Sequence, residues 1–175
     1  MLTGQNIKLR ALELLDVEQL YQWENTEDLW HLSNVVQPFS KEILTQYVKS
    51  VNDIYADKQL RLIIEKITAK EAIGAIDLFD FDPVNKRAGV GVLIADKQNR
   101  NLGFASEALQ LLIDYSFDTL QLHQLYCNIT EDNSASLNLF KKHNFKMCGQ
   151  KEQWIRKGNN FIDEYTLQLF SKTNS

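Results

Sequence analysis

Arg100-Asn101-Leu102-Gly103-Phe104-Ala105-Ser106 is the stretch that decides the fold, because the hydrophobic period of the chain changes at Gly103. Before it, the run from Ala88 to Ala95 is short, aliphatic and typical of a buried strand. After it, apolar side chains recur at helical spacing as far as Phe117, with no Gly or Pro between them. The stretch is therefore predicted to join a strand to a long helix.

The start of a helix exposes backbone N–H groups that have no partner within the helix, so it attracts anions. Gly103 and the small Ala105 let an anionic ligand approach the backbone, and Arg100 can add a charge-assisted hydrogen bond. A pyrophosphate group suits such a loop. The alternative is a strand-to-helix turn whose glycine serves backbone geometry alone, and a motif this short favours that alternative unless a second motif supports it.

The rest of the chain reads as alternating strands and helices, without repeats, low-complexity tracts or Pro/Gly/Ser linkers. The predicted strands are Asn6–Ala11, Leu60–Lys66, Ala72–Phe81, Ala88–Ala95 and Leu125–Thr130, followed by a terminal hairpin of Phe145–Ile155 and Phe161–Phe170. The predicted helices are Asp16–Trp23, Pro38–Val51, Gly103–Phe117 and Ser134–His143. The predicted fold class is α+β. We expect a single domain over residues 1–175, with a core of about 7–170 and a mixed, mainly antiparallel sheet flanked by helices.

Composition narrows the possible functions. The 175 residues are 44% hydrophobic and 24% charged, as in an ordinary globular protein. The net charge of −4 and the lack of a basic tract argue against nucleic-acid binding. No long apolar run and no leader pattern is present, so we expect a cytoplasmic protein without a membrane span. Cys127 and Cys148 lack the spacing of a metal or redox site and are predicted to be core thiols, and no metal is expected.

A second motif, Asn133 to Phe145, follows a predicted strand and forms a short helix with a polar start. With both motifs in view, the chain resembles the GNAT superfamily of acetyl-CoA-dependent N-acetyltransferases. That family's cofactor loop reads Q/R-x-x-G-x-G/A, and its later helix reads N-x-x-S-x-x-L-[YF]-x-K-x-G-F. The first pattern is matched by Arg100, Gly103 and Ala105, and the second by Asn133, Ser136, Leu139, Phe140, Lys142 and Phe145.

The resemblance covers nearly the whole chain, from Ile7 to Phe170. Within the family, the segments Ile7–Leu12 and Trp23–Glu27 are similar to the branch that contains spermidine acetyltransferases and ribosomal-protein N-terminal acetyltransferases. The resemblance implies acetyl transfer from acetyl-CoA to a primary amine, which can be a polyamine, a small amine or a protein N-terminus, by direct attack in a ternary complex. A CoA-binding sensor or scaffold with little catalysis is the alternative.

The resemblance also implies where the cofactor lies. The pyrophosphate would bind the amides from Asn101 to Ser106, and the pantetheine arm would pair with the strand near Val92 to Ile94 and contact Asn133. The sheet would open between the fourth and fifth predicted strands, where the thioester meets the amine. The implied cofactor-binding residues are Val92, Leu93, Ile94, Arg100, Asn101, Leu102, Gly103, Phe104, Ala105, Ser106, Asn133, Ser136 and Phe140.

Two positions depart from the family pattern. Gly89 stands where many relatives carry a Glu, and Phe140 stands where many carry a Tyr proposed to protonate the leaving thiolate. Gly89 and Gly91 share one face of their strand, which either clears space for the acyl group or the acceptor or indicates a bulge or tight packing. Phe140 is expected to pack against the cofactor as a wall.

The general base and acid are therefore unknown from the sequence. Glu27 and Asp77 lead a set of acidic residues that could serve the acceptor side, the others being Glu24, Asp28, Asp80 and Asp82.

The terminal strand pair has enough apolar content to support a homodimer.

Overall fold

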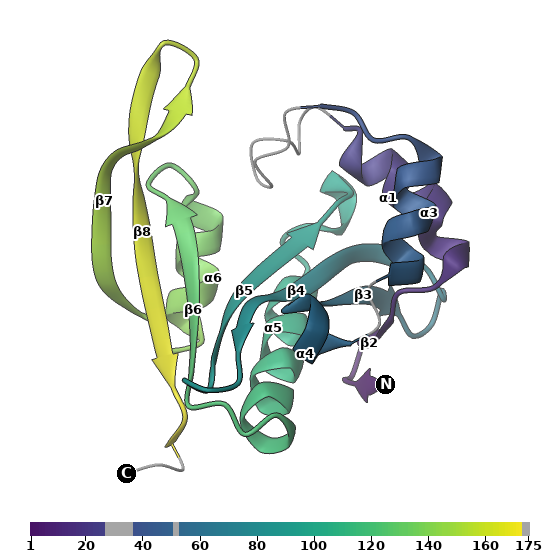
Figure 1. The fold of residues 1–175 in the computed structure, drawn as a ribbon, viewed down its shortest axis with the longest axis horizontal. Helices are drawn as coiled ribbons and strands as arrows, with labels where there is room; N and C mark the ends of the chain where they lie inside the picture. The colour runs from purple at the N-terminus through teal and green to yellow at the C-terminus, as the bar shows by residue number, and fades with distance from the viewer. Residues whose placement is uncertain (27–36, 51–52, 173–175) are drawn as a thin grey trace.

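A computed structural model gives the structure of the chain and describes residues 1–26, 37–50 and 53–172. One sheet contains eight strands in the order β1-β2-β3-β4-β5-β6-β8-β7 (Figure 1). The strands are β1 (Leu2–Thr3), β2 (Ile7–Ala11), β3 (Leu60–Lys66), β4 (Ala72–Asp82), β5 (Arg87–Ile94), β6 (Gln124–Thr130), β7 (Lys146–Lys157) and β8 (Asn160–Phe170). The helices are α1 (Val17–Glu24), α3 (Lys41–Ser50), α4 (Ile54–Asp57), α5 (Phe104–Asp114) and α6 (Ser134–Lys142).

Alternation along the strands builds two cores, one on each face of the sheet. On one face, Ile64 and Val90 pack in a large cluster with Leu109 of α5. On the other face, Ile63 packs in a smaller cluster with Leu20 of α1. The larger cluster also takes in Leu62, Ala88, Ala108, Leu112 and Phe140, and the smaller one Trp23, Leu44, Val48 and Ala95. Helix α5 and helices α1 and α3 therefore cover opposite faces.

The sheet opens between β5 and β6, as the family resemblance implied. These two strands are the parallel pair of the sheet, and their register runs only through Arg87–Gln124, Ala88–Leu125 and Gly89–Tyr126. Strand β5 continues to Ile94 and β6 to Thr130, and the two diverge in a V (Figure 1). Beyond Tyr126, β6 remains paired with β8 alone. The predicted fold class and the predicted opening are both confirmed.

Several element boundaries differ from those predicted. The helix expected to reach Phe117 ends at Asp114 and continues as a π-helical turn over Tyr115–Thr119. The fully buried Ser116 donates its hydroxyl to the Leu112 carbonyl at 2.7 Å, and a hydroxyl bonded in this way disturbs regular helical geometry. The helix predicted from Pro38 begins at Lys41, where the Ser40 hydroxyl accepts the Ile43 amide at 3.2 Å as a cap.

The prediction that both cysteines are core thiols is wrong for one of them. Cys127 is buried on β6, whereas Cys148 is exposed on β7. Strand β7 is the outermost strand of the sheet, so its side chains are less covered than those of a central strand. The Cys148 thiol lies 3.3 Å from the Thr166 carbonyl, to which it donates.

Glu107, in the first turn of α5, ties the start of that helix to β2. Its carboxylate accepts the Asn6 amide at 2.8 Å, the Asn6 side-chain amide at 3.0 Å and the Ile7 amide at 3.3 Å. Burial opposes the charged form, but these hydrogen bonds outweigh it and hold the pKa of Glu107 below its usual range. The position of the predicted anion-binding loop relative to the sheet thus depends on a charged contact distant in sequence.

Replacing Glu107 by Ala should lower the free energy of unfolding by about 1–3 kcal/mol, because the amides of Asn6 and Ile7 lose a charged acceptor. Urea unfolding measures this difference. Since the folded-state pKa is depressed, the stabilisation is present above the unfolded pKa of about 4.3 and is lost as the pH falls through the folded pKa. The gap between wild type and variant should therefore narrow in acid. A gap that stays constant to low pH would show that packing, and not charge, is responsible.

Candidate active site

The loop before α5 presents an open helix N-terminus. Asn101 and Gly103 both have positive φ, 61° and 87°, and the amide of Glu107 makes the first helical bond, to the Gly103 carbonyl at 3.0 Å. The amides of Phe104, Ala105 and Ser106 therefore precede the helical ladder. No side chain among the described residues caps this end, and a Cβ built on Gly103 meets nothing within 4 Å. The loop has the geometry of an anion site.

Arg100 contacts the protein backbone. Its guanidinium donates from Nε to the Ile94 carbonyl at 3.0 Å and from Nη2 to the Ala95 carbonyl at 2.9 Å. These bonds tie the loop to the end of β5. The sequence predicted a direct contact with a bound anion, and it did not anticipate this bracing role.

Val92, Leu93 and Ile94 form the part of β5 that borders the opening. On one side they pair with Ile76, Ala75 and Gly74 of β4, and on the other side the pairing with β6 has already ended at Gly89. The backbone of this segment therefore has one edge turned toward the V. A ligand arm lying in the V can hydrogen-bond to that edge as an added strand would.

The second motif forms α6 and is bonded to the first. Asn133 caps α6 by accepting the Ser136 amide at 3.1 Å. At the other end, the His143 ring lies 2.8 Å from the Ser106 hydroxyl of α5. Burial, helped by the nearby Lys142, lowers the pKa of His143, so the ring is neutral at pH 7. Asn144 occupies the glycine position of the family pattern and has a φ of 66°, a conformation that Asn tolerates.

Phe140 of α6 is a core residue. Its side chain is 3% exposed, and its ring meets Phe145 edge to face at a centroid distance of 5.0 Å. The predicted role as a wall against the cofactor is therefore limited to the small surface that it leaves uncovered.

The two glycines of β5 make room for an aromatic ring. A Cβ added to Gly89 would lie 2.3 Å from the Phe79 ring, and one added to Gly91 would lie 3.9 Å from it. The Phe79 ring in turn meets Tyr126 of β6 edge to face at 5.8 Å. Of the two interpretations offered for the glycines, the structure favours close packing at Gly89, because the space that it clears is occupied by Phe79, whereas a Cβ on Gly91 would make only an ordinary contact with that ring.

Asp77, one of the two acidic candidates, is engaged in an ion pair. Both of its carboxylate oxygens accept from Arg61, at 2.7 and 3.2 Å, and Arg61 also donates to Glu24 at 2.9 Å. The two carboxylates outweigh burial and raise the pKa of Arg61. Asp77 is therefore held by a fixed cation between α1 and the sheet. Glu27, the other candidate, lies outside the described residues, as does Asp28.

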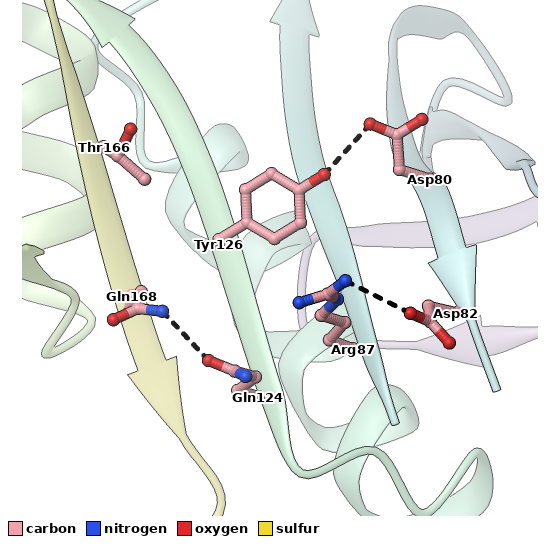
Figure 2. A pocket seen from close by; sticks show the side chains of 7 residues that line it. All are labelled: Asp80, Asp82, Arg87, Gln124, Tyr126, Thr166 and Gln168. Atoms are coloured by element: carbon pink, nitrogen blue, oxygen red, sulfur yellow. Dashed lines mark hydrogen bonds and ion pairs between the residues drawn. The ribbon is translucent and has the colours of Figure 1, made fainter. Parts of the chain in front are cut away.

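A polar cavity of about 540 Å³ opens on the sheet face opposite α5. Figure 2 shows Tyr126 reaching from β6 across β5 to Asp80 of β4, where its hydroxyl donates to the carboxylate at 3.0 Å. Sequence reasoning overlooked Tyr126, although the alternation of polar and apolar residues along Gln124–Thr130 shows that it points away from the core. The cavity is lined by Asp80, Asp82, Arg87, Gln124, Tyr126, Thr166 and Gln168.

Two further observations concern metal binding and membrane spanning in the described part of the chain. Within the described ranges, no group of three or more His, Cys, Asp or Glu side chains is arranged to hold a metal ion. Nor does this part of the chain contain a helix that is long and apolar enough to cross a membrane.

Comparison with known proteins identifies the class to which this fold and loop belong. A family model described as an acetyltransferase (GNAT) domain matches residues 6–146. The chain therefore belongs to the GNAT acetyltransferase family. It is an acyl-CoA-dependent N-acetyltransferase, an enzyme that transfers an acetyl group from acetyl-CoA to an amine.

Individual relatives indicate which branch of the family this chain resembles. The uncharacterised N-acetyltransferase p20 of Bacillus licheniformis is 27% identical over 170 residues, covering 96% of this chain and 94% of that protein. The spermidine N(1)-acetyltransferase of Escherichia coli K12 is 26% identical over 156 residues, covering 86% and 78%. A crystal structure of spermidine N-acetyltransferase from Vibrio cholerae in complex with CoA and spermine shares the fold, with a TM-score of 0.86 at 20% identity over 95% of this chain and 96% of that one. The predicted similarity to the spermidine acetyltransferase branch is confirmed.

Replacing Gly89 by Ala should destabilise the protein by about 1–3 kcal/mol, because the added methyl group overlaps the Phe79 ring. Chemical denaturation of the single variant measures the cost. In a Phe79→Ala background the same change should cost much less, and a double-mutant cycle gives the coupling between the two positions. Equal costs in both backgrounds would mean that the ring is not what excludes a side chain at Gly89.

Proposed function

We propose that this enzyme acetylates a polyamine, using acetyl-CoA bound between the start of α5 and the V between β5 and β6. The binding of the cofactor is supported by the uncapped N-terminus of α5, whose preceding loop is tied by Arg100 to the end of β5, and by the free edge of that strand. The acceptor part is supported by relatives named spermidine N(1)-acetyltransferases and by the net charge of −4, which favours a cationic substrate.

In this proposal the diphosphate of CoA accepts hydrogen bonds from the amides of Asn101 to Ser106, and the positive end of the α5 dipole favours it. The pantetheine arm lies along Val92, Leu93 and Ile94. Leu102 is 61% exposed in the loop and offers an apolar surface beside the diphosphate. Asn133, Ser136 and Phe140 border the arm from α6. Arg100 acts from its braced position through its charge.

The chemistry makes modest demands on side chains. A neutral amine attacks the thioester carbonyl carbon, the C–S bond breaks, and the amine proton passes to solvent or to a nearby carboxylate. Backbone N–H groups on the free edge of β5 stabilise the oxygen that gains negative charge. Phe140 cannot protonate the departing sulfur, but a thiolate whose conjugate acid has a pKa of roughly 8–9 is a tolerable leaving group at neutral pH. Positioning is then the main source of the rate.

We also propose a cytoplasmic location, because CoA thioesters do not cross membranes unaided.

We further propose that the enzyme forms a homo-oligomer through the β7–β8 hairpin. The hairpin lies at the end of the sheet and exposes four large apolar side chains, Met147, Trp154, Phe161 and Phe170. One structural neighbour, a spermidine N-acetyltransferase from Vibrio cholerae, is described as dodecameric.

A thiol-release assay with acetyl-CoA tests the proposed acceptor. The panel contains spermidine, spermine, propylamine and a short peptide with a free N-terminus, and a calorimetric titration with CoA runs beside it. We expect CoA binding and turnover with the polyamines. Turnover confined to the peptide would replace the polyamine by a protein N-terminus. CoA binding without turnover on any amine would indicate a CoA-binding sensor.

Replacing Gly103 by Val should weaken CoA binding about tenfold or more, because a β-branched residue cannot adopt the positive φ that aims the loop amides at the diphosphate. Gly158→Val is the matched control, since Gly158 also has a positive φ, 62°, and open space around it but lies in the β7–β8 turn. Both variants should lose similar stability in thermal unfolding. Calorimetry should show weaker CoA binding for Gly103→Val alone, and unchanged affinity would place the cofactor elsewhere.

A further inference from the structure

Asp80 is brought to the open face of the sheet by a β-bulge. Phe79 pairs with Gly89 and Asp82 pairs with Arg87, so Asp80 and Phe81 together oppose Ala88. Phe81 is buried in the main core, whereas Asp80 is exposed and has a φ of 48°. A bulge re-aims a side chain at some cost in backbone strain, and such strain is concentrated at functional sites.

The bulged carboxylate is held by Tyr126, on the strand beyond β5. Tyr126 can cross β5 because Gly89 and Gly91 present no side chains on that face, and its hydroxyl donates to Asp80 at 3.0 Å (Figure 2). Burial, and then the hydrogen bond to Asp80, raise the pKa of Tyr126 to about 12. The tyrosine therefore remains a neutral donor to the Asp80 carboxylate.

Asp80 is also the carboxylate in this cavity that no cation balances within the described residues. The other carboxylate, Asp82, lies 3.3 Å from the Arg87 guanidinium and accepts hydrogen bonds from Asn85. The opposite wall is neutral: the Gln168 amide donates to Gln124 at 3.0 Å, and Thr166 donates to Asn128 at 2.8 Å. A cation that enters the cavity meets the Asp80 carboxylate, which has spare acceptor capacity, beside the Arg87–Asp82 ion pair and opposite a wall of neutral hydrogen-bonding groups.

The cavity also adjoins the place where the strands separate. Tyr126 lines the cavity and is the last residue of β6 that pairs with β5, through Gly89. Two residues further along β5, at Gly91, the strands have already parted, and this step along a strand is roughly 7 Å. Two amines joined by a short alkyl chain have a separation of this order. An acceptor whose reacting amine lies in the V can therefore extend a second amine into the cavity.

We infer that this cavity binds the second, non-reacting ammonium group of a di- or polyamine acceptor, with the Asp80 carboxylate as its anchor. The inference rests on the proposed function and assigns its specificity to a particular side chain. Asp80 touches the substrate but takes no part in acetyl transfer. Removing the Asp80 charge should therefore raise the KM for acceptors that carry a second ammonium group, and should leave the reaction of a simple monoamine unchanged.

Asp80→Asn tests the inference, because Asn keeps the size of the side chain and tolerates positive φ while removing the charge. We expect the KM for spermidine to rise about tenfold or more, with kcat and the KM for propylamine changed less than twofold. Asp118→Asn, an exposed site in the π-helical turn, removes the same charge elsewhere and should leave both amines unaffected. Tyr126→Phe keeps the ring but frees the carboxylate, so spermidine should bind as well or better.

Calorimetry of spermidine with the CoA-saturated protein separates this inference from the proposed function. Weaker spermidine binding to Asp80→Asn than to wild type supports the cavity assignment even if the wild-type protein turns over no polyamine. An unchanged spermidine affinity and KM in Asp80→Asn would overturn it while leaving the acetyltransferase function intact. Equal losses for spermidine and propylamine would also overturn it, because a monoamine has no second ammonium group to lose.

Discussion

The end of the pairing between β5 and β6 is the constraint on which the rest of the structure depends. Parallel strands in a sheet normally satisfy each other's backbone groups along their length. Here the register stops at Gly89 and Tyr126, while both strands continue. In the proposed function, the free edge of β5 is where the pantetheine arm would pair, and the gap is the route by which the amine would reach the thioester from the other face. Helix α5 follows β5 in the chain, and Arg100 in the loop between them bonds to the carbonyls at the end of β5.

The glycines of β5 allow side chains of the two neighbouring strands, β4 and β6, to contact each other. Because Gly89 and Gly91 carry no side chains, groups from β4 and β6 meet above β5: Phe79 contacts Tyr126, and Tyr126 bonds to Asp80. The position at which many relatives carry a Glu is thus covered by the Phe79 ring, and a carboxylate from the neighbouring strand, Asp80, bonds to the Tyr126 hydroxyl. The proposed acceptor side therefore draws on three strands, β4, β5 and β6.

Much of the fold could be predicted from the sequence. The change of period at Gly103 and the aliphatic runs on either side correctly indicated the strand-to-helix junction, and the motif from Asn133 to Phe145 correctly indicated α6. These elements could be predicted because the patterns of strands and helices depend on the spacing of residues along the chain. The π-helical turn after Asp114 could not be predicted, since it depends on the burial of one serine hydroxyl by tertiary packing.

The site was less predictable, for the same physical reason. The bonds of Arg100 to two carbonyls were not anticipated, and the pairing of Asp77 with Arg61 joins residues on separate strands. Neither partner choice leaves a trace in sequence spacing. The interactions between Tyr126 and Asp80 and between Glu107 and β2 likewise link residues far apart in the chain, and only the folded sheet brings them together.

The bracing of β5 by Arg100 has an electrostatic consequence for the cofactor loop. The carbonyls of Ile94 and Ala95 end a strand close to the place where a diphosphate would lie, and their partial negative charges would repel it. A guanidinium bonded to both oxygens shields that repulsion and leaves a net positive field beside the loop amides. A lysine would carry the same charge but lacks the planar fork that reaches two carbonyls at once. Arg100 thus suits this position by its shape as much as by its charge.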